Sequence, residues 1–144
     1  MREKLTPYRL LADENTSHRF VAACQRLVAD FPILHLAHWE GGSWLGLDDS
    51  ALLIACGEHR VVLVAFDRAT LPWHAGQVLR AGENHGGLVL FRRAVRSADY
   101  GHQARLLTAF WREDGHAWDW INRIVYLPKS GVELRFSPET DSPA

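Results

Sequence analysis

Long hydrophobic runs and an excess of one charge are both missing from this 144-residue chain. The longest fully apolar stretch, residues 61–66, is far shorter than the roughly 20 residues that a membrane-spanning helix needs. Lys and Arg together number 16 and Asp and Glu 17, so the formal net charge of −1 provides no overall attraction to nucleic acid or membrane. Residues 1–10 lack the apolar core of a secretory signal, so we expect a cytoplasmic protein that does not bind membranes.

Lysine and cysteine are also scarce. Lys4 and Lys129 are the only lysines, so nearly all cationic side chains are arginines, whose planar guanidinium suits phosphate and carboxylate partners. Cys24 and Cys56 lie far apart and form no CxxC pair. This spacing predicts two reduced, buried thiols rather than a disulfide framework.

The composition is that of a folded domain. Hydrophobic residues make up 47% of the chain and charged residues 23%, close to the average of soluble globular proteins. A length of 144 residues fits one domain of ordinary size. We expect a single domain over residues 1–136 and a flexible polar tail over residues 137–144.

Hydrophobic periodicity divides the chain into alternating strands and helices. We expect strands over residues 8–12, 33–37, 61–66 and 87–91, with 124–127 and 132–136 as closing strands or a hairpin. We expect helices from Thr16 or Ser17 up to Pro32, from the Asp-Asp-Ser run at 48–50 onward, over 72–80 and over 98–112. Residues 61–66 show no polar alternation, which is typical of a parallel strand covered on both faces. The pattern predicts an α/β fold.

Acidic residues fall where three segments reach one edge of the predicted sheet. Asp13 follows the first strand, Asp67 follows the third, and Asp48 and Asp49 open the helix after the second. Ligands of open parallel sheets bind at the carboxyl ends of the strands. Carboxylates gathered there repel one another, and a hard divalent cation with oxygen ligands relieves that repulsion. We therefore interpret these acids as a candidate Mg²⁺ or Mn²⁺ site.

Each acid taken singly also has a structural interpretation. Asp48 can cap its helix, Asp67 can be a turn residue after a strand, and Asp13 can accept hydrogen bonds from amides of its own turn. The metal hypothesis rests on their grouping.

Three segments in order carry a resemblance to a known family. They are the Leu-Leu-Ala-Asp-Glu-Asn run at 10–15, the Asp-Ser-Ala-Leu-Leu run at 49–53, and the Val-Val-Leu-Val-Ala-Phe-Asp run at 61–67. Over residues 9–91 the chain resembles the PIN-like domains, in particular small PIN-like proteins related to VapC-type toxins, and residues 122–128 resemble them more weakly. The resemblance implies a three-layer α/β/α sandwich with a mostly parallel central sheet.

The resemblance also implies a function. Asp13, Asp49 and Asp67 would be the catalytic acids that hold Mg²⁺ or Mn²⁺ in a ribonuclease site, with Asp48 as the alternative if the register slips by one residue. A toxin of this type would cleave RNA, bind a protein antitoxin and self-associate, with a dimer expected. Two positions depart from the family pattern: Ala65 stands where a threonine is usual and Ala69 where a second aspartate is usual.

Basic and amide side chains extend the candidate site. Asn15 follows the first acid, Arg68 follows the third, and Arg92 with Arg93 follow the fourth predicted strand. We expect these four residues to contact the nucleic acid, the arginines through its phosphates.

The tryptophans fall into two groups. Trp39 and Trp44 flank a glycine loop and are candidates for an exposed contact, whereas Trp111, Trp118 and Trp120 are expected in the core or a subunit interface.

The departures leave two alternatives open. Ala65 and Ala69 favour a catalytically degenerate module that binds RNA or protein without cleaving it. The Trp-rich region would equally suit a structural protein that dimerises through residues 111–120.

Overall fold

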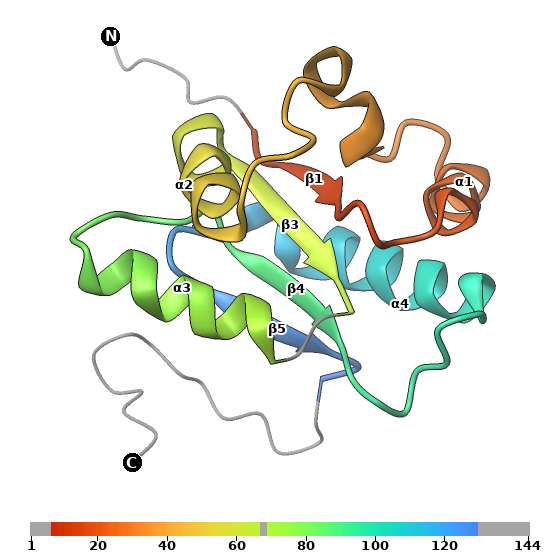
Figure 1. The fold of residues 1–144 in the computed structure, drawn as a ribbon. Coiled ribbons are helices and arrows are strands. Elements are labelled where there is room, and N and C mark those ends of the chain that lie inside the picture. The colour runs from red at the N-terminus through yellow and green to blue at the C-terminus, as the bar shows by residue number, and fades with distance from the viewer. Residues whose placement is uncertain (1–6, 67–68, 130–144) are drawn as a thin grey trace, which may run out of the picture.

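Short apolar segments form the strands of a five-stranded sheet, as seen in a computed structural model that describes residues 7–66 and 69–129 (Figure 1). The elements in chain order are β1 (Arg9–Ala12), α1 (His18–Leu27), β2 (Ile33–His35), η1 (a 3₁₀ helix, Leu36–Gly42), α2 (Asp49–His59), β3 (Val61–Ala65), α3 (Thr70–Arg80), β4 (Leu88–Phe91), α4 (Tyr100–Glu113), η2 (a 3₁₀ helix, Gly115–Ala117) and β5 (Ile124–Leu127). The predicted α/β alternation is therefore confirmed.

All neighbouring strands run parallel, in the order β2-β1-β3-β4-β5. The chain passes from β1 outward to β2 and then returns to the other side of β1 to form β3. Ala12, the last residue of β1, pairs with Val64 of β3. The carboxyl ends of β1 and β3 thus form the switch point of the sheet, where open α/β folds bind their ligands.

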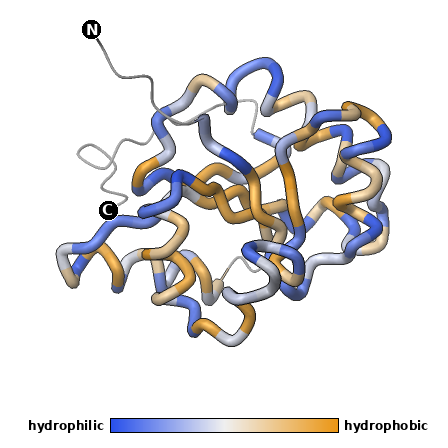
Figure 2. Tube along the Cα trace, turned by 90° about the horizontal axis from the view of Figure 1, so that it is seen from above, coloured by the Kyte–Doolittle hydropathy of each residue, from blue (hydrophilic) through white to orange (hydrophobic). Residues whose placement is uncertain are grey.

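Helices cover both faces of the sheet and make three layers. Successive strand residues point to opposite faces. Leu10 and Val62 pack in a cluster with residues of α1 and α4, whereas Leu11 and Leu63 pack in a second cluster with residues of α2 and α3. Figure 2 shows the strands as a hydrophobic centre ringed by more hydrophilic connections. This arrangement confirms the predicted three-layer sandwich with a parallel sheet.

The first helix is shorter than its hydrophobic stripe predicts. Ser17 caps it as expected, accepting the N–H of Arg19 at 3.0 Å. However, α1 ends at Leu27, and Val28 is already extended with φ −136° and ψ 107°. The chain must turn here to bring Pro32 beside β1, where its carbonyl accepts the N–H of Leu10 at 2.8 Å. The predicted end of this helix at Pro32 was therefore wrong.

Other element boundaries shift by a few residues. The strand expected over 33–37 ends at His35, because Leu36 begins η1. The helix expected over 72–80 is α3, which begins two residues earlier. The helix expected over 98–112 is α4, which begins two residues later and ends one residue later. The expected closing strand over 124–127 is β5 and pairs in parallel with β4. The second closing segment, 132–136, and the tail, 137–144, lie outside the described residues.

The tryptophans are placed only partly as expected. Trp111 and Trp120 are buried, at 5% and 0% exposure, in the cluster beneath α4, which confirms their place in the core. Trp39 is 2% exposed, so its prediction as an exposed contact was wrong. It lies in η1 and packs into the α2–α3 cluster, with the Arg9 guanidinium 4.5 Å from its ring centroid.

The helices within residues 7–66 and 69–129 include none that combines the length and the apolarity needed to cross a bilayer.

Candidate functional site at the carboxyl edge of the sheet

Asp13 lies at the switch point because β1 ends one residue before it. Its backbone N–H donates to the Val64 carbonyl of β3 at 3.0 Å, and its own carbonyl accepts the N–H of Thr16 at 2.9 Å. These two bonds hold the residue between the ends of β1 and β3 and start the turn into α1. The side chain is half-buried as a result.

The environment of Asp13 disfavours its charged form. Burial raises the pKa of Asp13, and the charges of Glu14 and Asp49 raise this pKa further. The backbone N–H groups of Glu14 and Asn15 oppose the shift. Neither amide carries a full positive charge, so these two groups stabilise the carboxylate as dipoles. A cation bound here would compensate that charge directly.

Asp49, the second acid of the site, belongs to the first turn of α2. Its Oδ2 lies 3.4 Å from Nε2 of His74, which comes from the second turn of α3. The Nδ1 of His74 lies 3.4 Å from the Ser50 hydroxyl. The imidazole therefore contacts two consecutive residues at the start of α2 and limits how the Asp49 carboxylate can rotate.

Asp48 caps its helix, which was the structural interpretation of this residue. Its Oδ1 accepts the N–H of Ala51 at 2.8 Å, so the side chain caps α2. A carboxylate at the helix N-terminus also interacts favourably with the helix dipole. Asp49, and not Asp48, is the acid whose charge acts on Asp13.

The predicted nucleic-acid contacts separate into two groups. Asn15 is exposed beside Asp13. Arg92 and Arg93 follow β4 on the same edge of the sheet, two strands away from β1, which corresponds to about 10 Å. Arg92 is partly engaged, because its Nε donates to the Pro128 carbonyl and its guanidinium lies 5.5 Å from the Tyr126 ring centroid. Arg93 is exposed.

Asp67 and Arg68 fall outside the described residues, so two of the predicted site residues have no structural account. Over residues 7–66 and 69–129, no group of three His, Cys, Asp or Glu side chains is arranged to hold a metal ion. The described part of the site thus consists of two carboxylates, Asp13 and Asp49, with His74 against the second.

The two cysteines have no chemical role at this site. Cys24 and Cys56 are free and buried, as predicted. Burial raises the pKa of each thiol to about 12, and the nearby Asp13 carboxylate adds to the shift at Cys56. Both side chains therefore remain protonated at neutral pH and act as core residues.

His74 is the residue that sequence reasoning missed. It stands in no metal-binding spacing, and its neighbours along the chain give no sign of a site. Only the packing of α2 against α3 brings it to Asp49, across a separation of 25 positions in the sequence.

Comparisons with protein-family models, with curated proteins and with solved structures found no match to this chain.

Proposed function

We propose that this chain is a Mg²⁺- or Mn²⁺-dependent endoribonuclease whose cation binds at Asp13 and Asp49. The observation that carries the proposal is the carboxyl group of Asp13, which lies half-buried at the switch point with the charge of Asp49 acting on it. A half-buried carboxylate that a second carboxylate repels favours a bound divalent cation, and oxygen ligands are those that Mg²⁺ and Mn²⁺ prefer. The sequence supplies Asp67 as the third acid.

Each residue of the site would have a separate role. Asp13 and Asp49 would hold the cation, and His74 would keep the Asp49 carboxylate oriented. A divalent cation in such a site orients water and stabilises the charge that develops at a phosphodiester. Arg93 is exposed and would meet a backbone phosphate about two strands away, and Asn15 would donate its amide to the same strand of RNA.

The biological setting belongs to the same proposal. The resemblance of the sequence to PIN-like proteins supports a cytoplasmic toxin that cleaves RNA, binds an antitoxin protein and forms a dimer. Each of these partners follows from the resemblance and is tested separately from the chemistry.

The second candidate is a degenerate module that binds RNA or protein without cleaving it. Ala65 and Ala69 favour it, because both lack the side-chain oxygen that the family pattern has at these positions. Ala65 is fully buried at the end of β3, and Ala69 directly precedes α3. With fewer oxygen ligands at this edge, cation affinity would fall.

Calorimetric titration of Mn²⁺ tests the proposal. We expect the wild type to bind Mn²⁺, and Asp13→Asn and Asp49→Asn to bind at least tenfold more weakly, since each loses an anionic ligand (about 1.4 kcal/mol for each factor of ten). Asp48→Asn is the matched control, because it removes a neighbouring charge while asparagine still caps α2. The same variants are then assayed for Mn²⁺-dependent cleavage of RNA.

Two results would contradict the proposal. The first is a wild-type protein that binds no Mn²⁺. The second is an Asp49→Asn variant that binds and cleaves as well as Asp48→Asn. RNA binding that survives both EDTA and the Asp13→Asn change, without cleavage, would support the degenerate module instead.

A further inference from the structure

Trp73 is an exception among the tryptophans of this chain. Its side chain is 59% exposed, whereas Trp39, Trp111 and Trp120 are at most 5% exposed. Trp44 and Trp118 are half-buried. An exposed indole leaves a large apolar ring in water and adds little to the stability of the fold. The position of Trp73 therefore calls for an explanation other than core packing.

The indole lies next to the candidate site. Trp73 is on α3, directly before His74, and the centroids of the two rings lie 4.9 Å apart at an interplanar angle of 81°. His74 in turn lies 3.4 Å from Asp49. The imidazole thus contacts both the indole and a carboxylate of the site.

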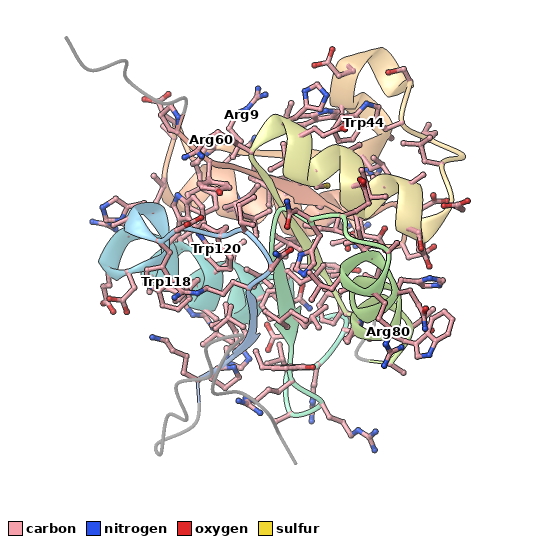
Figure 3. All side chains as sticks on the ribbon, turned by 90° about the vertical axis from the view of Figure 1, so that its left-hand side faces the viewer. Arg9, Trp44, Arg60, Arg80, Trp118 and Trp120 are labelled. Carbon is pink, nitrogen blue, oxygen red and sulfur yellow. The ribbon has the colours of Figure 1, made fainter. Side chains whose placement is uncertain are left out.

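The helix face that carries Trp73 continues in polar and cationic side chains. Gln77 and Arg80 are four and seven positions further along α3, which places them on the same side of an α-helix. Arg80 is exposed about 10 Å from Trp73 along the helix axis. Figure 3 shows Arg80 on the outer side of α3. Across the described part of the chain, no carboxylate forms an ion pair with it.

We propose that Trp73 is a stacking platform for a base of a single-stranded nucleic acid, and that Arg80 contacts the phosphate backbone of the same strand. An aromatic ring next to a cationic side chain is the combination by which single-stranded nucleic acids are bound. The bases of a duplex expose their edges and not their ring faces, so an exposed indole selects unpaired bases. A protein-docking surface would instead extend the apolar area, whereas the side of α3 that carries Trp73 continues in Gln77 and Arg80. The inference rests on the proposed function, because the strand bound at Trp73 would be the substrate that reaches the carboxylates.

Binding of a fluorescein-labelled oligouridylate, followed by anisotropy in EDTA, tests the platform without any cleavage. Loss of one stacked base weakens binding by about tenfold to a hundredfold, which is the effect expected for Trp73→Ala. Trp73→Phe retains an aromatic face, so the logarithm of its dissociation constant should rise by less than half as much as that of Trp73→Ala. Arg80→Gln should weaken binding and reduce its dependence on salt concentration.

Leu79→Ala is the matched control on the same helix. Leu79 is 43% exposed and lies on another side of α3, so its removal takes away exposed apolar surface without touching the platform. We expect its affinity to equal that of the wild type. Thermal unfolding of all four variants verifies that each remains folded. We expect them to fold because the substituted side chains are exposed.

The outcomes separate this inference from the proposed function. Wild-type affinity in Trp73→Ala, or no binding of oligouridylate by the wild type, overturns the stacking platform. A changed oligomeric state of Trp73→Ala with unchanged affinity also overturns it and assigns the indole to a protein contact. Hydrolysis of bis(p-nitrophenyl) phosphate with Mn²⁺ involves no base that could stack, so it reports the carboxylates alone, and Leu79→Ala should retain the wild-type rate. Binding that depends on Trp73 without any hydrolysis would contradict the nuclease and leave the platform intact.

Discussion

Single charged residues at the carboxyl edge of the sheet lower the stability of the folded protein. Asp13 is the clearest case, because burial and the neighbouring acids raise its pKa. The folded protein therefore binds a proton at Asp13 more readily than the unfolded chain does. By linkage, ionised Asp13 lowers the free energy of unfolding at neutral pH, and this penalty disappears as the pH falls through the pKa of the folded state.

Replacing Asp13 should consequently stabilise the metal-free protein. In EDTA at neutral pH we expect Asp13→Asn to unfold at a higher temperature than the wild type, since asparagine can still accept the N–H groups of the turn. The difference should shrink as the pH is lowered toward 4. With Mn²⁺ the order should reverse, because a cation that binds only the folded wild type stabilises it. A variant less stable than the wild type in EDTA would show that Asp13 serves the fold.

Whole elements decide which of two adjacent acids is structural. Asp48 and Asp49 are equivalent as sequence, but α2 begins between them, so Asp48 becomes the cap and Asp49 enters the first turn. The cap accepts one N–H that the helix cannot satisfy internally. The packing of α3 then brings His74 to Asp49 alone.

Removing the cap should affect stability and leave the site unchanged. Asp48→Ala should lower the free energy of unfolding by about 1 kcal/mol, the usual cost of losing an N-cap oxygen. Urea denaturation measures this loss, and the Mn²⁺ affinity of the same variant should equal that of the wild type. A drop in Mn²⁺ affinity as large as that of Asp49→Asn would make Asp48 a ligand after all.

The stability of the molecule as a whole depends on a buried histidine far from the site. His85 is 1% exposed, and its Nδ1 accepts the N–H of Gly87 at 3.0 Å at the start of β4. Asn122 links the His85 segment to the segment before β5, because its side-chain oxygen accepts the N–H of His85 at 3.0 Å. Burial lowers the pKa of His85 from 6.5 to about 4, so the folded protein holds it neutral.

Acid should therefore destabilise this protein in a defined interval of pH. Between pH 6.5 and about 4 the unfolded chain binds a proton at His85 that the folded state does not, so stability is lost as the pH falls. The shift corresponds to about 3 kcal/mol. His85→Asn retains an acceptor for Gly87 and cannot titrate, so its urea midpoint should vary less with pH than that of the wild type. Parallel pH profiles of the two proteins would contradict this role.

The sequence by itself determined the buried central strand and the starts of two helices. The unbroken apolar run over residues 61–65 predicts a strand buried on both faces, and Ser17 and Asp48 mark the starts of their helices. These features succeed because capping and hydrophobic periodicity act between residues that are close along the chain. The place of Asp13 at the carboxyl edge follows as well, since it comes directly after β1.

Only the tertiary structure decided the strand order, the partners of the acids and the exposure of the tryptophans. Nothing local distinguishes Trp39, which is buried in η1, from Trp73, which is exposed on α3. The contact between His74 and Asp49 joins two helices and has no spacing to reveal it. These properties depend on how distant segments pack against the sheet, and the energy of that packing is spread over many residues that are remote in the sequence.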